Sequence, residues 1–381
     1  MDFKLSQEQQ FIRESVRDFA EREIKPLAEG LDRDEKFSPE LTKKMGELGL
    51  FGMYLPEKYG GQGVDTLSYI IAVEEIARVD SSQAATLAAH NSLGIGPIYY
   101  YGTEEQKMKY LPKLCSGNHL WGFGLTEPEA GSDSRGSKTK AFLKDGIWHI
   151  DGNKTFITNA SNELALGSTI QAVTIGENDK MQFTTIIVEN GTPGFTQRAM
   201  KNKLMWRASD TAELFLDDCK VPEANLLGKV GQGSKIMLST LDNGRLSIGA
   251  MGLGLAQGAF EMALEYSQQR KQFGKPICKF QAIAFKLADM ALKIELGRNL
   301  LYKACWLKDN KIPFGKEAAM AKLYCGDIAK EVADEAVQIH GGYGLMKDYA
   351  IERFYRDQRL LQIGEGTAEI QRLVISRLIG C

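Results

Sequence analysis

The stretch KTKAFLKDGIWHIDGNKTFIT (Lys138–Thr158) decides the fold class, because short strand-forming runs alternate in it with turn residues. The clusters Lys144-Asp145-Gly146 and Asp151-Gly152-Asn153 predict two turns. The strands expected between them are Lys138–Leu143, Ile147–Asp151 and Thr155–Thr158. No long helix separates these strands, which favours an antiparallel barrel or sandwich over a nucleotide-binding βαβ array.

The strand pattern extends outward over residues 122–226 and gives way to helical spacing on both sides. Further expected strands are Gly122–Thr126, Thr169–Thr174, Phe183–Val188 and Ala212–Leu216. Expected helices include Leu41–Leu50, Thr66–Val79, Ser82–Leu93, Gln281–Leu307 and Lys316–His340, and the pairs Ser6/Gln9 and Thr103/Gln106 predict capped helix starts. We therefore expect an α+β protein with a helical domain (1–121), a β domain (122–226) and a second helical domain (227–381). The hinges between these domains would form the walls of a cleft.

The composition excludes several classes of protein. A net charge of −2 over 381 residues argues against a nucleic-acid-binding role. No run approaches the roughly 18 apolar residues of a membrane span, and Met1-Asp2-Phe3-Lys4 lacks the pattern of a secretory signal. Six cysteines without C-x-x-C spacing and four scattered histidines predict reduced thiols, no metal and a cytoplasmic location.

Glu365 stands between two glycines in the run Gln362–Arg372, directly before an amphipathic segment. Glycine on both sides lets the backbone approach a ligand closely and adopt unusual angles. Such a carboxylate suits a catalytic base, and it equally suits a solvated residue that the dipole of the following helix stabilises.

Four other runs carry candidate chemistry, and each also has a plain structural interpretation. Leu125–Asp133 could bind a ring or phosphate, or could form a polar turn. Arg270 could neutralise a diphosphate, or could end a helix in solvent. The glycines of Gln338–Gly344 could expose amides to phosphate, or could cap a helix. Arg245, which follows Asp242, could meet a ligand anion or a neighbouring glutamate. No G-x-G-x-x-G follows a predicted strand, so the Rossmann motif is absent.

Taken together, the runs resemble the acyl-CoA dehydrogenase family over essentially the whole chain, most closely its short-chain, butyryl-CoA-type members. The motifs that carry the resemblance are Leu125–Asp133, Lys154–Asn159, Arg270–Gly274, Gln338–Gly344, Tyr355-Arg356-Asp357 and Gly364–Arg372. Their order and spacing are specific, although each motif is weak alone. The resemblance implies an N-terminal helical domain, a middle β-barrel domain and a C-terminal four-helix bundle. It also implies FAD in the cleft between the last two domains.

The resemblance assigns roles by position. Phe123, Leu125, Thr126, Phe156 and Thr158 are expected around the isoalloxazine ring, with Thr367 and Glu369 as further cofactor contacts. Cofactor contacts supplied by a neighbouring subunit of a homotetramer are expected from Arg270, Gln272, Phe273, Gln281, Gln338, Gly341 and Gly342. Acyl-CoA contacts are expected from Ser132, Asp242, Arg245, Gly366 and Arg377.

By the same resemblance, Glu365 is the catalytic base that removes the α-proton of an acyl-CoA thioester, while the β-hydrogen leaves as hydride to flavin N5. The backbone N–H at this position and a ribityl hydroxyl would stabilise the enolate oxygen. Some relatives place the base one residue before Arg245, where this chain has Gly244, so the role is expected on Glu365 alone. Phe156 replaces the tryptophan of many relatives.

The expected function is oxidation of an acyl-CoA to the 2-enoyl-CoA in β-oxidation, with electron-transferring flavoprotein as acceptor. An oxidase or monooxygenase of the same superfamily and a non-catalytic binding protein are the alternatives; peroxide release in air would identify the first, and absence of a substrate-induced bleach the second. A short unbranched acyl group is the default. The His90-Asn91 pair is either a sign of an unusual acyl group or a structural polar pair.

Overall fold

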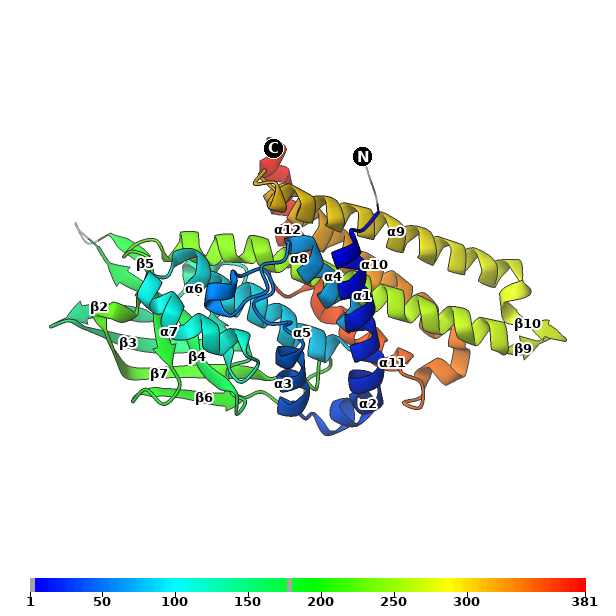
Figure 1. Cartoon of the computed structure of the whole chain (residues 1–381), viewed down its shortest axis with the longest axis horizontal. Coiled ribbons are helices and arrows are strands. Elements are labelled where there is room, and N and C mark those ends of the chain that lie inside the picture. The colour runs from blue at the N-terminus through cyan, green and yellow to red at the C-terminus, as the bar shows by residue number, and fades with distance from the viewer. Residues whose placement is uncertain (1–3, 177–179) are drawn as a thin grey trace.

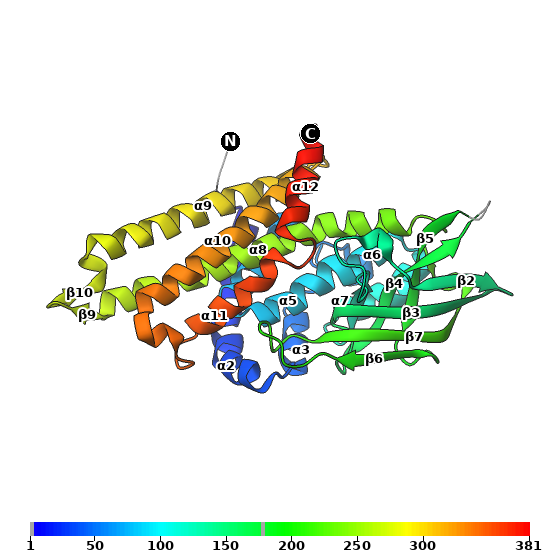
Figure 2. The ribbon, with the colours of Figure 1, turned by 180° about the vertical axis from the view of Figure 1, so that it is seen from behind.

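The protein is described here by a computed structural model that covers residues 4–176 and 180–381. Residues 1–3, on which part of the argument against a secretory signal depends, and residues 177–179 lie outside the described part. Figures 1 and 2 show an elongated molecule with the β-sheet at one end, long helices reaching the other end, and the N-terminal helices between them. No described helix is long and apolar enough to cross a bilayer.

The N-terminal region is helical, as expected. Its elements are α1 (Gln7–Phe19), α2 (Lys25–Asp34), α3 (Pro39–Glu47), α4 (Thr66–Ala77), α5 (Ser81–Ala89), α6 (Gly96–Tyr101) and α7 (Glu104–Cys115), with π-helical turns at Ala20–Ile24 and His90–Ile95. Both predicted helix caps are confirmed, and both are capping boxes: the Ser6 hydroxyl accepts from the Gln9 backbone amide, and the Thr103 hydroxyl accepts from the Gln106 backbone amide. These caps satisfy amides that a helix start otherwise leaves without partners.

The middle region forms one open, mixed sheet. Its strands are β1 (Leu120–Gly124), β2 (Lys140–Lys144), β3 (Ile147–Thr158), β4 (Ala165–Ile175), β5 (Met181–Glu189), β6 (Phe195–Ala199), β7 (Thr211–Pro222) and β8 (Leu226–Leu227). The order is β6-β7-β3-β2-β4-β5-β8, with β1 paired to β4. The predicted antiparallel barrel is therefore wrong, since β6 and β8 remain at separate edges and β4 runs parallel to both β1 and β2.

One predicted turn is confirmed and the other is wrong. Asp145 and Gly146 both have positive φ (52° and 75°) and close the β2–β3 hairpin. Asp151-Gly152-Asn153 instead lies inside β3, where the pairing with β7 shifts register between Ile150 and Gly152. Gly152 has φ +148°, and a Cβ there would lie 2.6 Å from the Thr139 Cα. The glycine therefore serves a bulge rather than a turn.

The C-terminal region contains three long helices and two short ones among the described residues: α8 (Gly233–Gln269), α9 (Gln281–Asp309), α10 (Gly315–His340), α11 (Ile351–Asp357) and α12 (Ala368–Leu378). The short strands β9 (Lys271–Gln272) and β10 (Lys275–Pro276) join α8 to α9. The predicted apolar stripes of α9 and α10 are confirmed as core, but the four-helix bundle implied by the resemblance is not.

Helix α8 lies at the centre because glycines on it admit other backbones. A Cβ at Gly252 would lie 2.6 Å from the Cys325 carbonyl oxygen of α10, and one at Gly254 would lie 2.2 Å from the Glu74 carbonyl oxygen of α4. Larger residues at these positions would push the helices apart. Helix α8 thus runs between the N-terminal helices and α10, and connects the sheet end to the far end of the molecule (Figures 1 and 2).

Candidate active site

Glu365 lies in the turn between the 3₁₀ segment Gln358–Gln362 and α12. It is in the left-handed region with φ +52°, and Gly366 follows with φ +92°. A glutamate in this region is strained, and such strain persists where the surroundings enforce it. Thr367 then caps α12 by accepting from the Ile370 amide at 3.3 Å. The glycine flank that marked this run in the sequence therefore serves a strained turn.

The Glu365 carboxylate points toward α8. Its Oε2 atom is buried and has no hydrogen-bond partner, and a Cβ added at Gly244 would lie only 1.8 Å from it. Gly244 therefore makes the space that the carboxylate occupies. Burial raises the pKa of Glu365 to about 7, although the positive charges of Lys322 and Arg245 oppose the rise. A carboxyl group that titrates near neutrality and has a free oxygen is suited to accept a proton.

The backbone around Glu365 is held from two sides. The Lys322 ammonium on α10 donates to the Gly366 carbonyl at 2.7 Å. The Gln371 side-chain amide donates to the same carbonyl at 2.9 Å and to the Glu365 carbonyl at 3.3 Å. Neither residue was predicted from the sequence. The available signal for Lys322 was its position among Ala318, Ala319 and Ala321, since a lysine on a buried stripe needs a partner.

Residues expected to bind substrate are only partly brought together. Arg245 is buried and forms an ion pair with Asp242 one turn earlier on α8, so its partner is an aspartate rather than the glutamate of the alternative. Burial raises the pKa of Asp242, and Arg245 opposes the rise. Gly366 adjoins Glu365, whereas Ser132 and Arg377 are exposed side chains with no described contact to this site.

The residues expected around the isoalloxazine ring lie at the same end of α8 as Glu365. Phe123 and Leu125 pack against Met237 and Leu241, which precede Gly244 on α8, and against Leu93. The Thr155 amide donates to the Thr126 carbonyl at 3.0 Å, which joins β3 to the loop after β1. Below this loop Lys154 is fully buried, with its ammonium 2.7 Å from Glu127.

A second bulge in β3 exposes Phe156. The pairing with β7 shifts register between Lys154 and Ile157, and Phe156 takes φ +59°. Its side chain is 66% exposed, which is unusual for a large apolar residue in a sheet. Thr158, two residues on, is half-buried. The bulge thus presents an aromatic face to solvent, which the strand pattern alone did not reveal.

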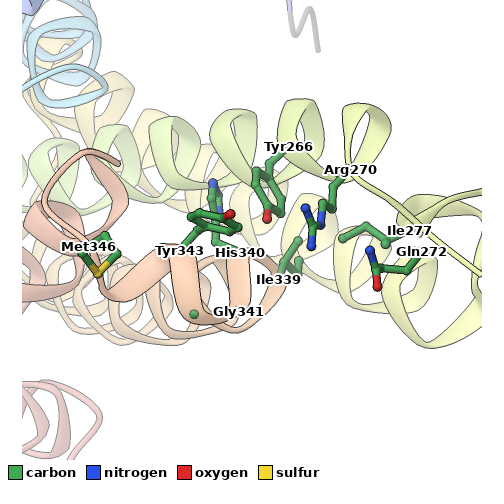
Figure 3. A pocket seen from close by; sticks show the side chains of 10 residues that line it. Tyr266, Arg270, Gln272, Ile277, Ile339, His340, Gly341, Tyr343 and Met346 are labelled. Atoms are coloured by element: carbon green, nitrogen blue, oxygen red, sulfur yellow. The ribbon is translucent and has the colours of Figure 1, made fainter.

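A second set of candidate residues lies at the opposite end of α8, around a cavity of about 580 Å³. Figure 3 shows Tyr266, Arg270, Gln272 and Tyr343 around it, together with the Gly341 turn after α10. Gly341 has φ +61°, and added Cβ atoms at Gly341 and Gly342 would meet nothing within 4 Å. A guanidinium, a side-chain amide and bare backbone at one opening suit a diphosphate. Phe273, Gln281 and Gln338 are exposed beside these elements.

The two sets are far apart. Gly244 lies near the start of α8 and Arg270 directly follows its end, which places them about 40 Å apart at the rise of an α-helix. Figures 1 and 2 agree in placing the sheet and β9–β10 at opposite ends of the molecule. One chain therefore cannot hold a single flavin dinucleotide with both sets.

His90 and Asn91 form a structural pair in the π-helical turn after α5. His90 Nε2 lies 2.9 Å from the Leu114 carbonyl, and the Trp121 amide donates to His90 Nδ1 at 3.1 Å. Asn91 donates to the Leu50 carbonyl and accepts from the Gly52 amide. Burial lowers the pKa of His90 to about 4, so its ring is neutral at pH 7. These bonds occupy both side chains.

Comparison with known proteins matches three family models in order. They are the acyl-CoA dehydrogenase N-terminal domain over residues 6–118, the middle domain over 122–219 and the C-terminal domain over 231–380. A curated relative, probable acyl-CoA dehydrogenase YngJ of Bacillus subtilis, is 51% identical over 378 residues and covers 99% of each chain.

Solved structures similar to this chain include members of the same family. Butyryl-CoA dehydrogenase from Megasphaera elsdenii is 44% identical with a TM-score of 0.96, and all of both chains is covered. A chain in the solved structure of electron transferring flavoprotein of Acidaminococcus fermentans is 45% identical, also with a TM-score of 0.96 and full coverage of both chains. An acyl-CoA dehydrogenase from Bacillus anthracis complexed with FAD is 35% identical with a TM-score of 0.93, covering 99% of this chain and 67% of that one.

Proposed function

The chain belongs to the acyl-CoA dehydrogenase family, and we propose that it oxidises a short-chain acyl-CoA to the 2-enoyl-CoA with Glu365 as the base. The observation that carries this proposal is the Glu365 carboxylate itself. It is buried against Gly244 with one oxygen free, and its pKa is raised to about 7. Similarity to butyryl-CoA dehydrogenase supports a short acyl group.

The residues present fit a bound FAD. Exposed Phe156 and the cluster of Phe123 and Leu125 offer an apolar face for a flat ring. Arg270 offers a guanidinium for a diphosphate, and the turn at Gly341, whose own N–H donates to the Gln338 and Val337 carbonyls, leaves open space beside it. When bound, FAD supplies the acceptor for the hydride that leaves the β-carbon of the substrate. Because the two sets lie about 40 Å apart, Arg270 of another copy would hold the diphosphate of each cofactor, as in the expected homotetramer.

Glu365 acts on the α-proton of the thioester. In its ionised form the free Oε2 takes this proton, and the proton then resides on Oε2. Hydrogen bonds from Lys322 and Gln371 hold the carbonyls of Glu365 and Gly366 and so fix the turn. In this fixed turn the backbone N–H of Glu365 would stabilise the enolate oxygen. Leu93 and the apolar cluster around it exclude water from this step.

Substrate contacts and the electron acceptor complete the proposal. The Asp242–Arg245 pair on α8 adjoins Gly244 and is placed to hold polar parts of the acyl-CoA. Similarity to the chain in the electron transferring flavoprotein structure supports that flavoprotein as the acceptor.

The test is anaerobic titration of the purified protein with acyl-CoAs, followed by flavin absorbance. The panel runs from butyryl to octanoyl, with isobutyryl, isovaleryl, glutaryl and cyclohexanecarboxyl thioesters. We expect the fastest bleaching with butyryl-CoA. Bleaching by a branched or cyclic thioester instead would correct the acyl group, and a protein purified without flavin would contradict the proposal as a whole.

A further inference from the structure

Lys322 is a buried cation behind the catalytic turn. It lies in the middle of α10, is 1% exposed, and directs its ammonium to the Gly366 carbonyl at 2.7 Å. Within the described part of the chain, no carboxylate lies within ion-pair distance of this ammonium. A lysine is almost never fully buried unless it is paired, because desolvation of its charge is costly. Its position therefore calls for an explanation beyond packing.

The other charged groups near Glu365 are already engaged. On α8, Arg245 is paired with Asp242. On α10, Asp327 lies 3.5 Å from Arg372 of α12, and Glu369 of α12 is exposed. On α4, Tyr69 donates to the Ala88 carbonyl, and burial raises its pKa so that it is neutral. Among the described groups facing the Glu365 carboxylate, Lys322 is thus the cation without a counter-carboxylate of its own.

We propose that Lys322 is a positioning residue for the reaction: its ammonium fixes the Gly366 carbonyl and supplies positive charge that favours the ionised form of the neighbouring base in its buried site. The reaction role rests on the function proposed above, but the electrostatic effect on Glu365 does not. Burial favours the protonated carboxyl group, which cannot accept the α-proton. A fixed cation offsets that effect without occupying the free oxygen Oε2.

The electrostatics of the pair agree with this arrangement. Burial lowers the pKa of Lys322 to about 8, and the Glu365 carboxylate opposes the fall. Conversely, burial raises the pKa of Glu365, and the positive charge of Lys322 opposes this rise more strongly than that of Arg245. At pH 7 the ammonium is therefore mostly charged while Glu365 titrates.

The direct test measures the titration of Glu365 without substrate. The protonated carboxyl band of Glu365, assigned by its disappearance in Glu365→Gln, is followed by infrared difference spectroscopy across pH in the flavin-loaded protein. In Lys322→Met the midpoint should move up by about one pH unit, since the positive charge with the larger lowering effect on the Glu365 pKa is lost. Lys322→Gln keeps a polar donor without the charge, so its midpoint should move by a similar amount.

Flavin reduction by the best acyl-CoA gives the second readout. A midpoint raised by one pH unit lowers the ionised fraction at pH 7 about fivefold, so the reduction rate should fall by at least about that factor and recover at higher pH. Lys308→Met is the matched control: this half-buried lysine on α9 lies over the rings of Tyr54 and Phe314. Its variant should leave the Glu365 midpoint unchanged.

An unchanged midpoint in Lys322→Met would overturn the inference, whatever happens to the rate. If Lys322→Met does not fold with flavin, the midpoint of Lys322→Gln decides in the same way. An equal shift in Lys308→Met would also contradict it, because the effect would then be general loosening. Failure of the wild-type protein to bleach with any acyl-CoA would refute the proposed function, while the infrared midpoints would still decide the inference.

Discussion

The two ends of α8 differ in how enclosed they are. Around Glu365, the carbonyls of Glu365 and Gly366 accept hydrogen bonds, Arg245 is paired with Asp242, and the buried Oε2 of Glu365 has no partner. Around Arg270, the cavity is open, and Phe273 is 93% exposed with φ +51°. We infer that the first end performs chemistry within its own chain, and that the second becomes a complete site only beside another copy.

The largest effect is expected from Glu365→Gln. The amide retains the shape of the side chain but cannot take the α-proton, so flavin reduction should slow by about a thousandfold. Stopped-flow reduction by butyryl-CoA measures it, with flavin content as the control for folding. A rate near that of the wild type would remove the catalytic role from this end of the molecule.

Gly244→Ala should have the next largest effect. The new methyl group would lie 1.8 Å from Oε2 in the present geometry, so the carboxylate must move. Misplacement of a catalytic group by about 1 Å can cost roughly a hundredfold in rate. Gly30→Ala on α2 is the matched control, since its Cβ would meet only the end of the Arg33 side chain at 3.9 Å. Equal rates in both variants would contradict the close fit of Glu365 against α8.

Arg270→Ala should weaken flavin binding rather than chemistry. Loss of a charged hydrogen bond to a phosphate costs about 1.5–3 kcal/mol, which corresponds to a roughly 10- to 100-fold weaker affinity for FAD. Reduction rates per bound flavin should stay near those of the wild type. Arg270→Ala chains should also be co-expressed with Glu365→Gln chains. A site that takes Glu365 from the first chain and Arg270 from the second should bind flavin and be active in mixed assemblies. If mixed assemblies recover neither flavin nor activity, Arg270 and Glu365 of one chain would have to serve the same flavin.

The smallest effect concerns stability. The pKa of Glu365 is raised in the folded protein, so its contribution to stability is present at low pH and is lost as pH rises through about 7. Glu365→Gln should therefore melt at a higher temperature than the wild type at pH 8, and the gap should narrow at pH 5. Thermal unfolding of both proteins at the two pH values measures this, and a gap that widens at pH 5 would contradict the burial argument.

The sequence predicted the elements better than their arrangement. Helix caps such as Ser6 and the Asp145-Gly146 turn depend on neighbouring residues, and they were confirmed. The direction of pairing between β1 and β4 depends on residues far apart in the chain, and the antiparallel barrel was wrong. Asp151-Gly152-Asn153 suits a turn and a bulge equally, and only the contact with Thr139 selects the bulge.

The candidate site likewise combines features that are visible in the local sequence with contacts between distant segments. Glu365 could be singled out because its flanking glycines are visible in the sequence. Gly244 leaves room for the Glu365 carboxylate, and Lys322 supplies the cation behind it. Both roles arise where α8, α10 and the Glu365 turn meet. Such contacts between distant segments leave no local pattern beyond a lysine on a buried stripe. The exposed Phe156 likewise depends on a bulge against β7.

The most direct test of the account is the rate of anaerobic flavin reduction by butyryl-CoA as a function of pH. If Glu365 is the base, the rate should rise about tenfold per pH unit at low pH and level off above a midpoint near 7. A rate that does not vary between pH 5 and pH 9, or the absence of reduction by every acyl-CoA of the panel, would contradict the assignment.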